Sequence, residues 1–284
     1  MLKILTINGA RLHVEDQGEG PAILTLHGGL GLGSRQGDVA AFGVLASEGY
    51  RVVSYDQRGN GDSEAVAPYS HEQFIADTEE LRQQLDLGKI ILCGSSYGGF
   101  LALEYALKYP QNLAGIVLRD TAASNAYNDR AKKLALKSGL PGVDAEMLDR
   151  LFAGKTRSNE DFLQMYKAIQ SLYFVTSDPE ILEARLKGVK VHHETHNWAY
   201  ANNIPTFNLV DRLKTIQVPM LVLCGRYDWI TPLAASEEIA REVPNSRLVV
   251  FEHSGHSPQR EEPEKFYREV RQFLDKAFSK AELK

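Results

Sequence analysis

Mainly apolar runs of five or six residues alternate with longer amphipathic stretches along most of the chain. Such runs are typical of parallel strands that are buried on both faces of a sheet. They occupy residues 22–26, 51–55, 89–93, 113–118, 220–224 and 247–251. Helical patterns lie between or after them, at residues 70–87, 100–107, 233–242 and 263–278. This alternation predicts an α/β fold with a mostly parallel sheet and helices on both faces.

The N-terminal pattern predicts a strand that turns back on itself. Residues 1–7 contain one lysine and a brief apolar stretch, and Asn8-Gly9 separates them from the alternating residues 11–15. An Asn-Gly pair between two strand patterns favours a tight hairpin turn. We therefore expect a first β-strand here rather than a signal peptide.

The pattern changes between residues 124 and 215. Strand-like runs disappear there, and helical patterns such as residues 161–169 take their place. We predict a helical cap at 124–215, inserted into a core formed by residues 1–123 and 216–284. A cap over the sheet would shape a pocket and exclude water from it.

Composition and charge narrow the range of partners. The 284 residues are 43% hydrophobic and carry a net charge of −5, which argues against nucleic acid as the main partner. No apolar run is long enough to span a bilayer. Cys93 and Cys224 lie in apolar runs, so we expect two buried thiols, without a disulfide or a metal, in a cytoplasmic protein.

A candidate nucleophile stands at one strand end. Gly94-Ser95-Ser96-Tyr97-Gly98 lies between the apolar run 89–93 and the helical pattern 100–107. Strand, Gly-x-Ser-x-Gly and helix is the context in which the serine is a nucleophile on a sharp turn. The alternative is an ordinary glycine-rich turn. We predict that Ser96 is the nucleophile.

A serine hydroxyl needs a base, and the base needs a carboxylate to orient it. His256 follows the run 247–251 and is flanked by small residues, so it is the expected base; His253 is the alternative. Asp228 follows the run 220–224 and is the expected carboxylate. The chain order is Ser96, Asp228, His256. This order of nucleophile, carboxylate and base is the one found where the nucleophilic serine lies on such a strand-to-helix turn.

Two backbone N–H groups are expected to bind the developing oxyanion. One belongs to Tyr97, directly after the nucleophile. The other lies in the glycine-rich loop His27-Gly28-Gly29-Leu30-Gly31, where Gly29 is the expected donor and Leu30 the next choice. This loop lacks the Gly-Lys-Ser/Thr ending of a phosphate loop. Residues 56–63, which include Arg58, are expected to brace the site rather than react.

Substrate contacts are expected from Leu30 and from the cap residues Tyr166 and Trp198; the alternative is that the cap aromatics simply hold the cap together. The run 192–196 contains three histidines, but its spacing differs from His-Glu-x-x-His, so we expect hydrogen bonding rather than metal binding. The predicted chemistry needs no metal ion and no organic cofactor.

Three motifs carry a resemblance to a known fold family. The chain resembles α/β-hydrolase-fold serine hydrolases over nearly all of its length outside the cap. His27-Gly28-Gly29, Asp56-Gln57-Arg58-Gly59 and Gly94 to Gly99 are similar to the proline iminopeptidase group, although Leu30 replaces its usual proline. That group holds the substrate's free amine with cap glutamates, for which Glu160, Glu183 and Glu194 are available.

The C-terminal motifs resemble a different branch of the fold. Residues 255–258 and 261–264 are more similar to carboxylesterases and acyl-homoserine lactone hydrolases. We therefore expect cleavage of a small carboxylic ester or lactone through an acyl-enzyme. The alternative is proline iminopeptidase activity on short peptides with the same triad. A C–C bond hydrolase and a non-catalytic ligand receptor remain open, and the sequence does not predict an oligomeric state.

Overall fold

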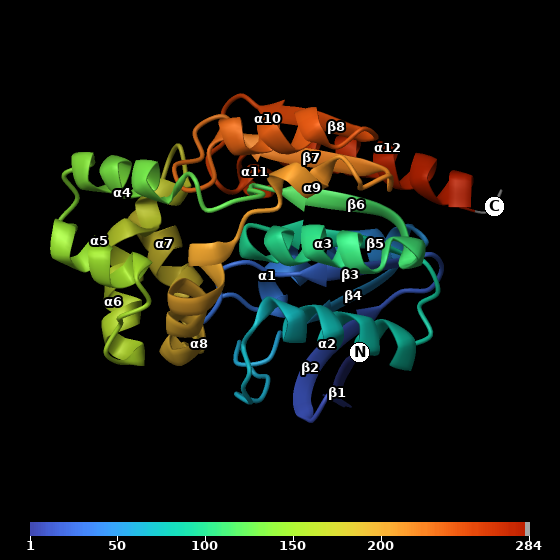
Figure 1. Cartoon of the computed structure of the whole chain (residues 1–284), viewed down its shortest axis with the longest axis horizontal. Coiled ribbons are helices and arrows are strands. Elements are labelled where there is room, and N and C mark those ends of the chain that lie inside the picture. Colours follow the sequence, from blue (N-terminus) through green and yellow to red (C-terminus); the bar gives the residue numbers. More distant parts are fainter. Residues whose placement is uncertain (282–284) are drawn as a thin grey trace.

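The computed structural model describes residues 1–281 and contains one eight-stranded sheet (Figure 1). Its strands are β1 (Leu2–Ile7), β2 (Ala10–Gln17), β3 (Ala22–Leu26), β4 (Arg51–Tyr55), β5 (Ile90–Ser95), β6 (Leu113–Arg119), β7 (Met220–Gly225) and β8 (Ser246–Phe251). They lie in the order β1-β2-β4-β3-β5-β6-β7-β8. β1 and β2 pair antiparallel, β2 also runs antiparallel to β4, and all other neighbours are parallel.

Helices cover both faces of the sheet, which confirms the predicted fold class. The apolar side chains of α1 (Arg35–Phe42) and α12 (Pro263–Ala281) pack with one face of the sheet. Those of α2 (His71–Gln84), α3 (Tyr97–Lys108) and α10 (Leu233–Glu242) pack with the other. Every residue of β3, β5, β6 and β7 is buried, as their continuous apolar runs predict.

The segment predicted as the cap contributes helices and no strand to this sheet. Its helices are α4 (Asn128–Lys137), α5 (Ala145–Phe152), α6 (Asn159–Ile169), α7 (Pro179–Leu186), α8 (His193–Trp198) and α9 (Val210–Leu213). α4 to α8 lie together beside one end of the sheet (Figure 1). α4, α5 and α6 share a separate apolar cluster. A β-bridge joins Ser124, the first residue of the segment, to Asn208, near its end.

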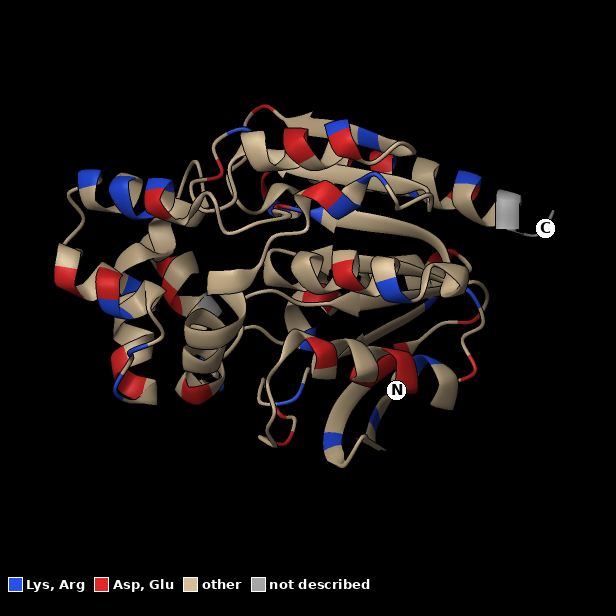
Figure 2. Ribbon diagram, viewed as in Figure 1, with Lys and Arg blue, Asp and Glu red and all other residues tan. Residues whose placement is uncertain are grey.

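Acidic and basic residues are interspersed on the outer helices (Figure 2). Cys93 and Cys224 are both buried and unbridged, as expected. Within residues 1–281, no helix combines the length and the apolar character that a membrane span needs.

Candidate active site

Ser96 occupies a sharp turn between β5 and α3. Its φ of 51° and ψ of −120° lie in a region that non-glycine residues rarely adopt. Its backbone N–H donates to the Arg119 carbonyl at 2.9 Å, and the Thr121 hydroxyl donates to its carbonyl at 2.7 Å. A Cβ at Gly98 would lie 1.9 Å from the Leu26 carbonyl oxygen, so the turn can form only with glycine at this position.

His256 and Asp228 lie together at the ends of β8 and β7. The imidazole Nδ1 of His256 is 2.7 Å from Oδ2 of Asp228. Asp228 is buried, and it also accepts hydrogen bonds from the Ile230 and Thr231 N–H groups and from the Thr231 hydroxyl, at 2.8 to 3.1 Å. Because the carboxylate is held from several sides, it can fix which nitrogen of His256 carries the proton.

Ser96 and His256 line one cavity, whereas His253 is exposed outside it. The backbone N–H of His253 donates to Glu262 at 3.0 Å, which ties this residue to the start of α12. The structure therefore places Ser96 and His256 in one cavity and Asp228 at hydrogen-bond distance from His256, whereas the alternative, His253, lies outside the cavity.

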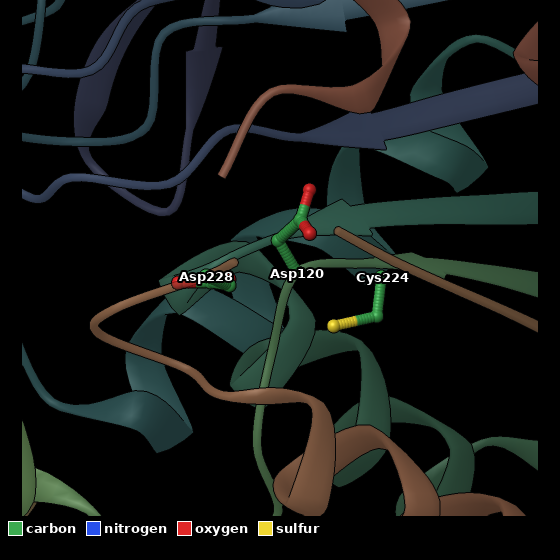
Figure 3. A group of neighbouring side chains, drawn as sticks. All are labelled: Asp120, Cys224 and Asp228. Carbon is green, nitrogen blue, oxygen red and sulfur yellow. The ribbon is translucent and has the colours of Figure 1, made fainter. Parts of the chain in front are cut away.

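A second buried carboxylate, Asp120, lies beside Asp228 (Figure 3). It follows β6 with a φ of 48°, and one of its oxygens accepts the Gly225 N–H at 2.9 Å, while Oδ2 has no hydrogen-bond partner among residues 1–281. Oxygen atoms of Asp120 and Asp228 and the Cys224 sulfur lie within 4.8 Å of one another. Sequence reasoning missed Asp120, although a carboxylate directly after a buried strand was an available signal.

These buried groups change one another's protonation. Burial and the charge of Asp228 raise the pKa of the Asp120 carboxyl well above its usual range. Burial opposes protonation of His256, but the charges of Asp228 and Asp120 outweigh it and raise the pKa of the imidazole. Burial and the same carboxylates raise the pKa of the Cys224 thiol, so this sulfur stays protonated and is a poor metal ligand.

The glycine-rich loop after β3 lies against the serine turn. Gly29, with a φ of +62°, Leu30 and Tyr97 all line the cavity that holds Ser96. Within residues 1–281, no protein acceptor contacts the backbone N–H of Gly29 or of Tyr97. Both predicted donors are therefore available to a bound ligand.

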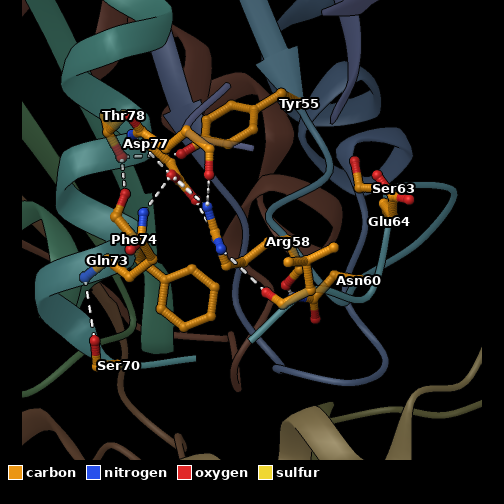
Figure 4. Close-up of polar contacts among 12 residues, drawn as sticks. Tyr55, Arg58, Asn60, Ser63, Glu64, Ser70, Gln73, Phe74, Asp77 and Thr78 are labelled. Atoms are coloured by element: carbon orange, nitrogen blue, oxygen red, sulfur yellow. Dashed lines mark hydrogen bonds and ion pairs between the residues drawn. The ribbon is translucent and has the colours of Figure 1, made fainter. Parts of the chain in front are cut away.

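The loop of residues 56–63 holds this glycine-rich loop in place. The Gln57 side-chain amide donates to the His27 carbonyl at 2.8 Å, and the Gly31 N–H donates to Asn60 Oδ1 at 2.7 Å. Arg58 anchors the supporting loop through a buried ion pair with Asp77 of α2, at 2.5 and 2.8 Å (Figure 4). The predicted bracing role of this loop agrees with these contacts.

The cavity has a volume of about 400 Å³ and is lined by strand-end loops and by residues of the segment 124–215, predicted as the cap. The lining from this segment is mainly apolar and includes the aromatic rings of Phe162, Tyr166, Tyr173, His196 and Tyr200. Leu30 and Tyr166 thus lie where the sequence predicts substrate contacts. The sequence did not predict that His196 lines the cavity. Its buried ring stacks on Phe162 with centroids 4.1 Å apart, and burial lowers its pKa to about 4.

The expected contact from Trp198 is wrong. Its indole is 37% exposed and packs edge-on against Tyr69, with ring centroids 6.3 Å apart, and it does not line the cavity. His196 and Tyr200, four residues apart, face the cavity. Trp198 lies midway between them, and a helical residue two positions from another points to the opposite side.

The three cap histidines use their ring nitrogens separately. His192 contacts the Gly61 carbonyl at 2.9 Å, and His196 contacts the Leu151 carbonyl at 3.0 Å. His193 contacts Asn159 Oδ1 at 3.0 Å. Each ring thus has its own hydrogen-bond partner, as expected for a run that does not have metal-binding spacing.

The fold and the strand-end site together define the class of this protein. The chain belongs to the α/β-hydrolase fold family, whose model matches residues 21–263. It is therefore a hydrolase of this fold.

Individual relatives differ in their named activities. Proline iminopeptidase PfmaB of Pestalotiopsis fici is 33% identical over 283 residues, which cover 97% of this chain and 100% of the relative. The proline iminopeptidase of Saccharolobus solfataricus is 28% identical, covering 93% of this chain and 87% of its own. The structure of an esterase from Exiguobacterium antarcticum has a TM-score of 0.80 and 28% identity, and it covers 97% and 100% of the two chains. The curated relatives agree better with the peptide-cleaving alternative than with the ester expectation.

Proposed function

We propose that this chain cleaves small carboxylic esters, including lactones, through an acyl-enzyme on Ser96. His256 accepts the Ser96 proton as the oxygen attacks the carbonyl carbon, and then donates it to the leaving oxygen. Asp228 accepts a hydrogen bond from the Nδ1–H group of His256 and stays ionised, which leaves Nε2 as the base. The Gly29 and Tyr97 N–H groups stabilise the oxyanion, and water activated by His256 releases the acid.

The observation that carries the ester proposal is the chemistry of the cavity wall. A free α-amine needs a carboxylate that faces the substrate. Glu160, Glu183 and Glu194 are all exposed, and none of them lines the cavity. Asp38 and Asp120 do line it, but both are almost fully buried. The aromatic cap side suits an apolar acyl group better than an ammonium group held by a carboxylate.

The second candidate is a proline iminopeptidase that uses the same residues. The named activities of the relatives support this candidate more than the first, and 33% identity over nearly the whole chain is substantial support. The triad would then transfer an N-terminal prolyl group to Ser96. We also propose that residues 124–215 form the cap in either case and that it selects the acyl group.

A direct comparison of substrates separates the two candidates. We expect p-nitrophenyl esters and a lactone to be hydrolysed with kcat/KM at least about 100-fold above that of prolyl p-nitroanilide, a ratio that unpaired polar groups in a site can readily produce. N-acetylated prolyl anilide is the control. Preference for the free prolyl anilide, with loss of activity on acetylation, would instead establish the aminopeptidase.

The pH dependence tests the environment proposed for the base. His256 must be neutral to accept the Ser96 proton, so kcat/KM rises with pH through the pKa of His256. Asp120 contributes to raising that pKa. Asp120→Asn removes this negative charge, so we expect the acidic limb of the kcat/KM profile to move to lower pH while the plateau persists. An acidic limb at the same pH as in the wild type contradicts this electrostatic assignment.

A further inference from the structure

A second chain of hydrogen bonds lies directly behind the serine turn. His71, at the start of α2, places Nδ1 2.7 Å from Oε1 of Glu104 on α3. Its other ring nitrogen, Nε2, is 2.6 Å from the hydroxyl of Tyr97. Asn203, from the cap, donates from its side-chain amide to the same hydroxyl at 2.9 Å. The four side chains connect two core helices, the residue after the nucleophile and the cap.

Hydrogen-bond chemistry determines which atom donates at each link between Glu104 and Asn203. An ionised carboxylate only accepts, so Glu104 requires a proton on Nδ1 of His71. In a neutral imidazole Nε2 is then an acceptor, and the Tyr97 hydroxyl donates to it. The remaining lone pairs of the Tyr97 oxygen accept from Asn203. Every donor therefore faces an acceptor, and no group in the chain competes with another.

The surroundings hold these groups rigidly. The Tyr97 side chain is 5% exposed, and burial raises the pKa of its phenol, so the hydroxyl keeps its proton. The His71 ring packs edge-on against Tyr97 and Phe207, with centroid distances of 5.2 and 5.5 Å. Asn203 is tied down by a further bond from its amide to the Tyr69 carbonyl at 2.9 Å. The tyrosine ring therefore has little freedom to turn.

We propose that Glu104, His71 and Asn203 are positioning residues that fix the Tyr97 backbone N–H as an oxyanion donor and tie it to the cap. The proposal rests on the function proposed above. The N–H and the side chain of Tyr97 share one Cα, so holding the hydroxyl between His71 and Asn203 also restricts rotation of the peptide plane next to Ser96. An oxyanion donor stabilises charge only when it is already aimed at the oxygen. Because Asn203 of the cap contacts the Tyr97 hydroxyl, the orientation of the Tyr97 N–H depends on the position of the cap.

Tyr97→Phe is the direct test, and Tyr105→Phe is its matched control. Tyr105 lies on the same helix and is fully buried, and its hydroxyl donates to Glu79 at 2.5 Å, away from the cavity. Both variants lose a buried tyrosine hydroxyl bond, so both are expected to melt at lower temperature. We expect only Tyr97→Phe to react with a p-nitrophenyl phosphonate at least about tenfold more slowly, with a matching fall in kcat and an unchanged KM for esters.

Glu104 supplies a second pair of variants. In Glu104→Gln the amide oxygen can still accept from Nδ1 of His71, so the direction of the chain survives, whereas Glu104→Leu removes the acceptor. We expect the leucine variant to react as slowly as Tyr97→Phe and the glutamine variant to recover most of the rate. A purely structural role predicts rates that follow the melting temperatures instead.

The outcomes separate this proposal from the function on which it rests. If the phosphonate labels wild-type Ser96, and Tyr97→Phe reacts as fast as Tyr105→Phe below both melting transitions, the positioning role is wrong and the nucleophile stands. If the phosphonate does not label wild-type Ser96, the proposed function itself is wrong. Assays of all variants at one temperature, with residues labelled by the phosphonate identified by peptide mass spectrometry, distinguish these results.

Discussion

Ser96→Ala is expected to lower kcat for ester hydrolysis by at least about ten-thousandfold, because the residual rate then comes only from binding and the oxyanion donors. The melting temperature should stay close to that of the wild type. Alanine carries the same Cβ as serine, so the cost of the 51° φ at this turn is unchanged. Steady-state kinetics and a thermal melt on the same preparation measure both effects.

The neighbouring serine provides the control for this experiment. Ser95 is the last residue of β5, is also buried and lines the same cavity. Ser95→Ala should keep most of the activity, because no catalytic role is assigned to its hydroxyl. If the two variants lose similar activity, or if Ser96→Ala stays active, the assignment of Ser96 as nucleophile is refuted.

Asp77→Asn is expected to destabilise the fold by about 3–5 kcal/mol, the usual cost of leaving a buried charge unpaired. Arg58 and Asp77 are each 1% exposed, and Arg58 remains charged when its partner becomes neutral. The substitution also weakens the acceptor for the Asn8 and Gln73 side-chain amides. Urea unfolding gives the free energy of unfolding of both proteins.

An exposed ion pair provides the comparison. Asp149 lies 3.1 Å from Lys132, and its side chain is 73% exposed. Asp149→Asn should cost less than about 1 kcal/mol because solvent screens such a pair. If Asp77→Asn and Asp149→Asn lower the free energy of unfolding by the same amount, burial of the Arg58–Asp77 pair does not explain the stability of the 56–63 loop. An equal loss of stability would also weaken the argument that this loop braces the site.

Much of the site could be predicted because strand ends concentrate chemistry in this architecture. Ser96, Asp228 and His256 each follow a mainly apolar run, and parallel strands bring their carboxyl ends to one edge of the sheet. The tight turn at Ser96 can also be recognised in the sequence, because neither Gly94 nor Gly98 has room for a Cβ and both positions must be glycine. These signals are local in sequence, so no knowledge of long-range packing was needed.

The missed features depend on contacts between distant segments. Trp198 and Tyr200 look equivalent in the sequence, and only the rotation of the helix shows that Tyr200 faces the cavity. His71 and Glu104 come from different helices, so no local pattern predicts that they meet at Tyr97. Substrate choice has the same difficulty, because it depends on how the cap side chains are seated over the core.

Trapping the acyl-enzyme tests the central claim most directly. We expect mixing with a p-nitrophenyl ester, followed by an acid quench, to give one bound acyl group per chain, and peptide mass spectrometry to place it on Ser96. Ser96→Ala should carry no acyl group under the same conditions. An acyl group on another residue, or ester turnover by a chain that never carries one, would contradict the account.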